Sequence, residues 1–260
     1  MAQEQRLDFL IRWLLKERKA SENTALSPDL AEKRRILRSL MNVRPPAAIS
    51  EEFLKVQDAY LEERLAERGT VSLKELTPVR PGIYLWQGDI TRLAVDAVVN
   101  AANSQMLGCF VPCHGCIDNA IHSAAGLQLR DACAEIMRAQ GHPEPAGRAK
   151  LTCAYNLPAR YVLHTVGPIV GRWVTWKDRR ELAACYRSCL ALAAEHDLRS
   201  VVFCCISTGE FHFPNQEAAE IAVRTVREFL EQQTTSVERV IFNVFKDLDA
   251  AIYRRLLGPD

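Results

Sequence analysis

Apolar residues recur at helical spacing through the first part of the chain. Residues 7–19 repeat leucine and isoleucine at intervals of three and four, which predicts an amphipathic helix. A second helix is expected to begin at Ser27, which would serve as its N-cap, and to end before Pro45. A third is expected to begin after Ser50. We therefore predict a helical N-terminal lobe over residues 1–80 that acts as a scaffold and supplies no catalytic group.

The pattern then changes to short runs of β-branched and aromatic residues that alternate with helical segments. The strand-like runs are 83–87, 96–100, 151–155, 161–166, 201–206 and 240–245, and the helical segments are 118–138, 178–196, 214–232 and 248–257. Several of the strands are apolar at every position, which is typical of strands buried on both faces of a parallel sheet. We therefore predict a three-layer α/β domain with a mainly parallel central sheet over residues 81–260.

Composition and charge narrow the class of protein. The chain has 260 residues, of which 48% are apolar and 25% charged, as in ordinary soluble globular proteins. Lys and Arg number 33 against 32 Asp and Glu, so no excess of charge predicts nucleic acid or an anionic membrane as a partner. No apolar run approaches the roughly 18 residues needed to span a bilayer. The nine scattered cysteines, with no apolar leader, favour a reducing cytoplasm over a disulfide framework.

Three of the cysteine and histidine residues fall close together in the loop that joins the strand at 96–100 to the next helix. Cys109, His114 and Cys116 offer two thiolates and one imidazole, a set that suits zinc. Cys113 could be a fourth ligand, which would close the site and make it structural. If the loop is extended there, however, Cys113 faces away from its neighbours. We favour one zinc per chain held by three ligands, with a coordination position left open for chemistry.

Several other conspicuous residues are expected to have structural roles only. The Lys33–Arg35 run lies in the second predicted helix and is interpreted as a solvated helix face. His122 is interpreted as a hydrogen-bonded helix histidine. The remaining cysteines lie in apolar surroundings, where free thiols often pack as small buried groups: Cys133, Cys153, Cys185, Cys189, Cys204 and Cys205.

Three further motifs lie at the ends of predicted strands. Asp89, in the sequence QGDIT, offers a carboxylate that can accept a hydrogen bond from an exocyclic amine such as that of adenine. Residues 100–103 read NAAN and offer amide donors and acceptors for ribose hydroxyls. Residues 207–214 follow a strand and precede a helix, where backbone N–H groups can form an anion cradle. Taken alone, the first two motifs are better interpreted as ordinary turns, and the third is a weak signal of an anion site.

Taken together and in this order, these motifs resemble the macrodomains, a family of ADP-ribose-binding α/β modules. QGDIT, VDAVVNAANS, IDNAIHSAAG and ISTGEFHFP carry the resemblance, which covers residues 81–255. The run MLGCFVPCHGC stands where hydrolytic macrodomains usually carry glycines, and His212 stands where macrodomains often have glycine. With the N-terminal extension, this loop resembles the zinc-containing macrodomains of microbes. That resemblance implies a protein ADP-ribosyl hydrolase, often found beside a sirtuin-like ADP-ribosyltransferase.

The resemblance also implies roles for individual residues. Asp89 would bind the adenine amino group, with a backbone contact from Ile90, and Phe245 would stack on the adenine ring. Asn103 would contact the distal ribose and, with Asp118, would serve the catalytic step. Asp118 matches the acidic residue before the first loop helix of the hydrolytic branch, where it could position or deprotonate the attacking water. The pyrophosphate and distal ribose would be wrapped by Ser207, Thr208, Gly209, Glu210 and Phe211.

Three functions stay open on the sequence. The leading hypothesis is a zinc-dependent hydrolase that removes mono-ADP-ribose from protein side chains, with an ester-linked Asp or Glu as the expected linkage. The alternatives are a reader that binds ADP-ribosylated proteins with a structural zinc, and an O-acetyl-ADP-ribose deacetylase. The three-ligand count and the presence of Asp118 favour an enzyme, although a fold alone does not fix a function.

Overall fold

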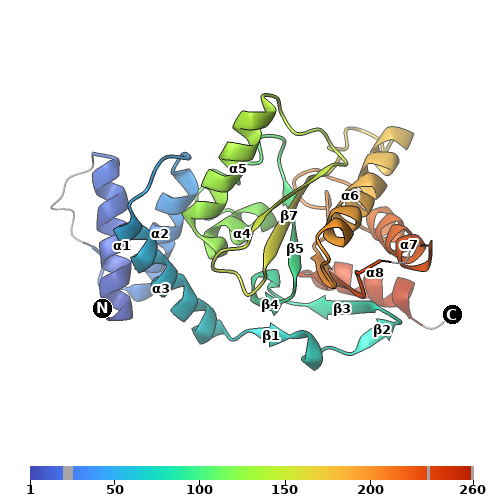
Figure 1. Ribbon diagram of the computed structural model, residues 1–260, viewed down its shortest axis with the longest axis horizontal. Helices are drawn as coiled ribbons and strands as arrows, with labels where there is room; N and C mark the ends of the chain where they lie inside the picture. Colours follow the sequence, from blue (N-terminus) through green and yellow to red (C-terminus); the bar gives the residue numbers. More distant parts are fainter. Residues whose placement is uncertain (20–25, 233–234, 259–260) are drawn as a thin grey trace.

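In the computed structural model, which describes residues 1–19, 26–232 and 235–258, a helical lobe adjoins an α/β body (Figure 1). The lobe consists of α1 (Gln3–Glu17), α2 (Leu30–Val43) and α3 (Glu51–Arg68). Their apolar stripes meet in a core that includes Leu7, Leu10, Ile11, Leu14, Leu37, Met41, Phe53 and Tyr60. Leu127 of the α/β body packs into the same core, so the lobe is attached by buried apolar contact.

The helix starts of the lobe match the sequence in one case and differ in another. Ser50 caps α3 as predicted, because its side chain accepts a hydrogen bond from the N–H of Phe53 at 3.1 Å. The prediction that Ser27 caps α2 was wrong. Asp29 is the N-cap, and its carboxylate accepts from the N–H of Ala31 at 2.9 Å. A carboxylate also interacts favourably with the positive end of the helix dipole, which explains why Asp29 takes the position.

The Lys33–Arg35 run is not a solvated face throughout, because its first member is buried. Lys33 Nζ lies 2.8 Å from a carboxylate oxygen of Glu4 and 2.8 Å from one of Asp8, and its side chain is only 7% exposed. Both carboxylates belong to α1, so the sequence of α2 alone could not reveal them. A buried ammonium is tolerated when carboxylates pair with it in this way. Arg35, in contrast, is exposed as predicted.

Seven strands form the central sheet. Their spatial order is β2 (Pro78–Arg80), β3 (Ile83–Gln87), β9 (Arg239–Val244), β8 (Ser200–Phe203), β5 (Ala97–Ala102), β7 (Tyr161–Val166) and β6 (Ala149–Cys153). The five inner strands run parallel, and only the edge strands β2 and β6 are antiparallel to their neighbours. The prediction of a mainly parallel sheet is therefore confirmed. A small parallel pair, β1 (Val71–Ser72) with β4 (Leu93–Ala94), lies beside it.

Helices cover both sides of this sheet, and Figure 1 shows β5 and β7 between α4 and α5 on one side and α6 and α7 on the other. The helices are α4 (Ile117–Ala125), α5 (Leu127–Gln140), α6 (Trp176–Glu195), α7 (Asn215–Gln232) and α8 (Asp247–Leu257). The single helix predicted over 118–138 is instead two helices that meet at Gly126. This glycine has φ +100°, a conformation that L side chains rarely adopt, so the chain turns there.

The boundary between the lobe and the α/β body lies in the segment that joins α3 to β3. α3 ends at Arg68, whereas β2 at Pro78–Arg80 already pairs with β3. The division at residue 80 stays a prediction. Within the described residues, no helix is both long enough and apolar enough to cross a membrane.

The prediction of core or near-core cysteines holds for five of the six residues. Cys133, Cys185, Cys189 and Cys204 are buried. Cys205 is half-buried against the core, and Cys153 is exposed. The prediction was wrong for Cys153 because this residue ends β6, an edge strand with a neighbour on one side only.

Candidate functional site

Two loops meet at the carboxyl edge of the sheet, where parallel α/β proteins usually bind their ligands. The first, 103–116, follows β5, and the second, 204–214, follows the adjacent strand β8. His114 Nε2 of the first loop lies 3.5 Å from the Glu210 carboxylate of the second. The two loops therefore lie close together at this edge of the sheet.

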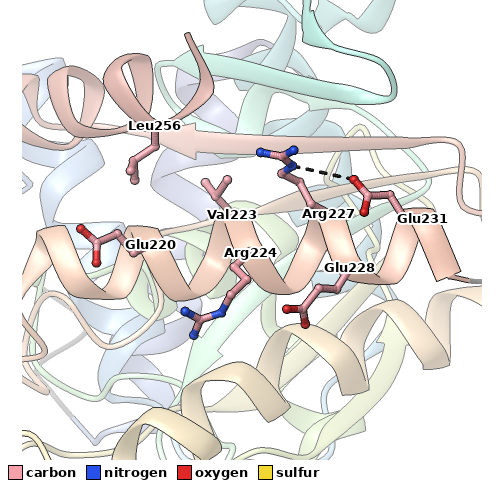
Figure 2. A pocket seen from close by; sticks show the side chains of 7 residues that line it. All are labelled: Glu220, Val223, Arg224, Arg227, Glu228, Glu231 and Leu256. Carbon is pink, nitrogen blue, oxygen red and sulfur yellow. Dashed lines mark ion pairs between the residues drawn. The ribbon is translucent and has the colours of Figure 1, made fainter. Parts of the chain in front are cut away.

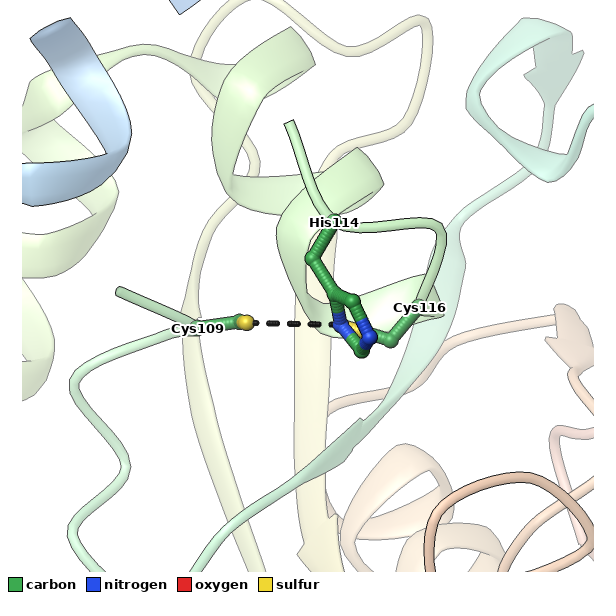
Figure 3. A group of neighbouring side chains, drawn as sticks. All are labelled: Cys109, His114 and Cys116. Carbon is green, nitrogen blue, oxygen red and sulfur yellow. Dashed lines mark hydrogen bonds between the residues drawn. The ribbon is translucent and has the colours of Figure 1, made fainter. Parts of the chain in front are cut away.

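The cysteine and histidine cluster is assembled in the first loop (Figure 3). The donor atoms of Cys109, His114 and Cys116 all lie within 4.8 Å of one another, and Cys109 Sγ is 3.6 Å from His114 Nδ1. Tetrahedral coordination at ordinary zinc bond lengths separates donor atoms by about 3.5–3.8 Å, so two sulfurs and one nitrogen in this arrangement fit zinc. Burial raises the pKa of the Cys116 thiol to about 12, and the neighbouring Cys109 adds to the effect.

Cys113 points away from this cluster, as predicted. Its Sγ donates a hydrogen bond to the carbonyl of Arg35 at 3.3 Å, and its N–H donates to Asn42 Oδ1 at 2.9 Å. Both partners belong to α2. Its φ of +53° shows that the chain turns sharply there rather than running extended, so the orientation was predicted correctly for a different reason.

The two predicted catalytic residues lie beside the cluster. Asp118 stands in the first turn of α4, two positions after Cys116, and is 5% exposed. Its Oδ1 accepts from Asn100 Nδ2 at 2.8 Å, and its Oδ2 lies 3.5 Å from Asn103 Nδ2. Burial raises the pKa of Asp118 to about 6, against the hydrogen bond from Asn100 and the positive charge of Arg130, which both lower it.

A buried polar network behind Asp118 was not expected from the sequence. Asn100 Nδ2 also lies 3.2 Å from His164 Nδ1, because β5 and β7 pair these residues directly. His164 Nε2 lies 2.9 Å from Thr152 Oγ1. The interpretation of His122 was wrong: its Nε2 lies 3.4 Å from Asp118, yet neither ring nitrogen has a hydrogen-bond partner. Its position four residues after Asp118 on one helix was the available sequence signal.

The predicted adenine-binding residues fall at one corner of the sheet. Asp89 Oδ1 accepts from the N–H and hydroxyl of Thr91 at 3.0 and 2.7 Å, which caps a short 3₁₀ turn at Ile90–Arg92. Asp89 Oδ2 pairs with Arg68 Nη1 of α3 at 3.0 Å. Phe245 follows the neighbouring strand β9 and is 77% exposed. Arg68 is the member of this corner that sequence reasoning missed.

The loop after β8 turns tightly between Ser207 and Phe213. Ser207 and His212 have φ of +65° and +57°, and the N–H of Phe213 donates to the Ser207 carbonyl at 2.9 Å. His212 therefore adopts the left-handed conformation that glycine favours at this position. Ser207 Oγ is buried without a hydrogen-bond partner and lies against Gly167.

The other predicted loop residues divide between backbone support and solvent. Thr208 Oγ1 donates to the carbonyl of Cys205 at 3.0 Å. Phe211 packs against a small buried cluster formed by Ala102, Met106 and Val166. Glu210 lies in solvent apart from its contact with His114, since its side chain is 68% exposed. Gly209 carries the carbonyl that accepts from the His212 N–H at 3.1 Å, which closes the turn.

A separate hollow lies on the outer side of α7 (Figure 2). Its volume is about 330 Å³, and it is lined by Glu220, Val223, Arg224, Arg227, Glu228, Glu231 and Leu256. Arg227 and Glu231 pair across one helical turn at 3.9 Å. None of its lining residues comes from the loops 103–116 or 204–214, so this hollow is not part of the candidate site.

Comparisons with known proteins agree with this architecture. The Macro domain family model matches residues 99–222. The chain is 52% identical to a protein-ADP-ribose hydrolase of Treponema medium, covering 99% of this chain and 100% of the relative. It is 49% identical to a protein-ADP-ribose hydrolase of Staphylococcus aureus strain Mu50, covering 98% and 96%. The crystal structure of a Trypanosoma brucei macrodomain in complex with ADP-ribose is similar, with TM-score 0.67, 35% identity and coverage of 85% and 95%. The chain belongs to the macrodomain family.

Proposed function

We propose that this chain is a zinc-dependent protein ADP-ribosyl hydrolase that removes mono-ADP-ribose from modified Asp or Glu side chains. The observation that carries the proposal is the position of Asp118 and Asn103 beside the Cys109, His114 and Cys116 cluster. The names of relatives about half identical over nearly their full length support the hydrolase class. The cytoplasm and a sirtuin-like ADP-ribosyltransferase as the source of substrate stay predictions.

ADP-ribose would lie along the carboxyl edge of the sheet. Asp89 and Phe245 would hold the adenine end, because β3 and β9 place them at one corner. The loop at 207–211 would enclose the pyrophosphate with its backbone N–H groups. The distal ribose would then reach Asn103, whose amide lies between Asp118 and the carbonyl of Gly108 at 3.5 and 3.2 Å.

The proposed reaction breaks the bond between C1″ of the ribose and the ester oxygen of the modified side chain. Water attacks C1″, Asp118 takes the proton that the water loses, and the bonding electrons leave with the carboxylate of the protein. Asn103, which does not titrate, orients the ribose. Cys109, His114 and Cys116 would hold zinc, which would supply Lewis acidity to this reaction.

The test is single-turnover release of ADP-ribose from an Asp/Glu-modified protein at saturating enzyme. We expect release by the zinc-loaded protein, loss of release after chelation, recovery on zinc addition, and none from Cys116→Ala. Full activity in zinc-free Cys116→Ala would show that the metal is not needed for the chemistry. Tight binding without release would favour the reader, and cleavage of O-acetyl-ADP-ribose alone would favour the deacetylase.

A further inference from the structure

The N-terminal lobe contacts the segment of the first loop that lies between the cluster residues. This segment, residues 109–116, contacts α2 through the backbone of Cys113 and His114 and through the Cys113 thiol. Arg38 and Asn42 of α2 each form a hydrogen bond with this segment, and Arg38 also bonds the helix that follows it. The two residues lie one helical turn apart. The contacts are polar and directional, whereas a lobe that served only as a cover would need apolar contact alone.

Arg38 fixes the loop through two routes. Its Nη2 donates to the carbonyl of His114 at 3.1 Å. Its Nε and Nη2 both donate to Asn119 Oδ1, at 3.0 and 2.7 Å. Because this fork occupies the oxygen of the fully buried Asn119 amide, the amide nitrogen must point the other way, where it donates to the carbonyl of Val111 at 3.0 Å.

Asn42 fixes the turn at Cys113. Its Oδ1 accepts the N–H of Cys113, and its Nδ2 donates to Ser123 Oγ of α4 at 3.0 Å. Asn42 is 1% exposed, so water does not compete for either contact. The bond stabilises the left-handed conformation of Cys113, which turns that thiol toward the Arg35 carbonyl and leaves His114 facing the cluster.

We propose that Arg38 and Asn42 are positioning residues of the metal centre, and that the lobe thereby forms the outer half of that centre. Neither residue belongs to the donor set of Cys109, His114 and Cys116. They hold Val111, Cys113 and His114 so that the ligand atoms converge before metal binds, which lowers the ordering cost of binding. The claim that these residues promote zinc binding rests on the proposed function, whereas the claim that they order the loop does not.

The experiment compares four full-length variants with wild type. Arg38→Met and Asn42→Leu keep the size of the side chain and remove its hydrogen bonds. Arg35→Met is the matched control, since this exposed arginine contacts the loop only through its backbone carbonyl. Asn42→Asp is the rescue, because it keeps the oxygen that accepts from Cys113. The readouts are Zn²⁺ affinity by competition with a chromogenic chelator, and amide hydrogen exchange of residues 109–116 in zinc-free protein. Circular dichroism checks the fold.

We expect Arg38→Met and Asn42→Leu to lose about 10–100-fold in Zn²⁺ affinity. The same variants should exchange faster at residues 109–116, while Arg35→Met stays near wild type and Asn42→Asp, which keeps the accepting oxygen but buries a carboxylate, loses less than Asn42→Leu. Exchange and affinity in Arg38→Met and Asn42→Leu that match Arg35→Met would overturn the inference. If wild type binds no zinc yet these two variants exchange faster at 109–116, the positioning role stands and the zinc-dependent function fails.

Discussion

At the residue scale, Asp118 differs from an ordinary surface carboxylate because the protein surrounds it with amide donors and almost no water. Asn100 holds one of its oxygens at 2.8 Å, and the other faces Asn103. Asp118→Asn keeps the shape of the group and removes its capacity to take a proton. We expect single-turnover release to slow by about 10²–10⁴-fold. Calorimetric affinity for ADP-ribose should change much less, and the exposed Asp197→Asn should leave both unchanged.

Asp89 offers a test of the other end of the site. Removing a charge-assisted hydrogen bond to the adenine amine should cost about 1.5–3 kcal/mol of binding free energy in Asp89→Ala. The same change also removes the ion pair with Arg68, so Arg68→Met is the matched control. The side chains of that pair are about a third exposed, so its loss should weaken the free energy of ADP-ribose binding by no more than about 1 kcal/mol. Equal calorimetric losses in the two variants would contradict the adenine placement.

The residues that sequence reasoning found are those whose chemistry is concentrated in one loop. Cys109, His114 and Cys116 fall within eight consecutive positions, so their proximity follows from the chain itself. Their supports could not be found in this way. The pairing of Asn100 with His164 depends on strand register, and the contact of Arg38 with Asn119 depends on how two distant helices dock.

At the scale of elements, periodicity predicted where helices and strands lie, but tertiary contacts decided where some of them end. The helical pattern runs through 118–138 without a break, yet Gly126 ends α4. The reason lies outside the helix: the side chain of Gln57 from the lobe accepts the N–H of Leu127 at 3.0 Å, so the chain turns to meet α3. Local contacts also decided the start of α2, where Asp29 rather than Ser27 is the N-cap.

Gly126 therefore allows a test of how the two helices are joined. A Cβ at this position would lie 2.6 Å from Gln128 Oε1 and 2.7 Å from Gln57 Nε2, at a φ of +100°. Gly126→Ala should lower the free energy of unfolding in urea by about 1–3 kcal/mol. Gly141→Ala is the comparison, because a Cβ there meets nothing within 4 Å and its φ of +76° and ψ of +6° are a left-handed conformation that other residues also adopt, so this variant should lose less stability. Equal losses in both variants would mean that the contacts of Gly126 with Gln57 and Gln128 add no cost.

At the scale of the whole molecule, the lobe reaches both ends of the site. Arg68 of α3 pairs with Asp89 at the predicted adenine corner, and Arg38 of α2 supports the loop that carries the Cys109, His114 and Cys116 cluster. Both contacts cross from the lobe to the α/β body, which the buried Leu127 also joins. The lobe was predicted to supply no catalytic group. That prediction is compatible with a lobe that orders the predicted catalytic and metal-binding residues of the α/β body.

Metal binding should then appear as a property of the whole molecule, because a ligand that binds only the folded state stabilises all of it. Free zinc at about 100 times its Kd adds about 2.7 kcal/mol to the free energy of unfolding. For a chain of this size, that raises Tm by about 5–11 °C in a calorimetric scan. We expect this increase in Tm in the wild type and no increase in Cys116→Ala.

Cys113→Ala decides how many ligands take part in this rise. The Cys113 thiol bonds the Arg35 carbonyl and takes no part in the cluster, so this variant should keep the full zinc-dependent increase in Tm even if its Tm without zinc is lower. A closed site of four ligands leaves no coordination position for substrate. Loss of the increase in Cys113→Ala would therefore identify Cys113 as a ligand in solution, and the metal would order the loop without taking part in the cleavage of ADP-ribose.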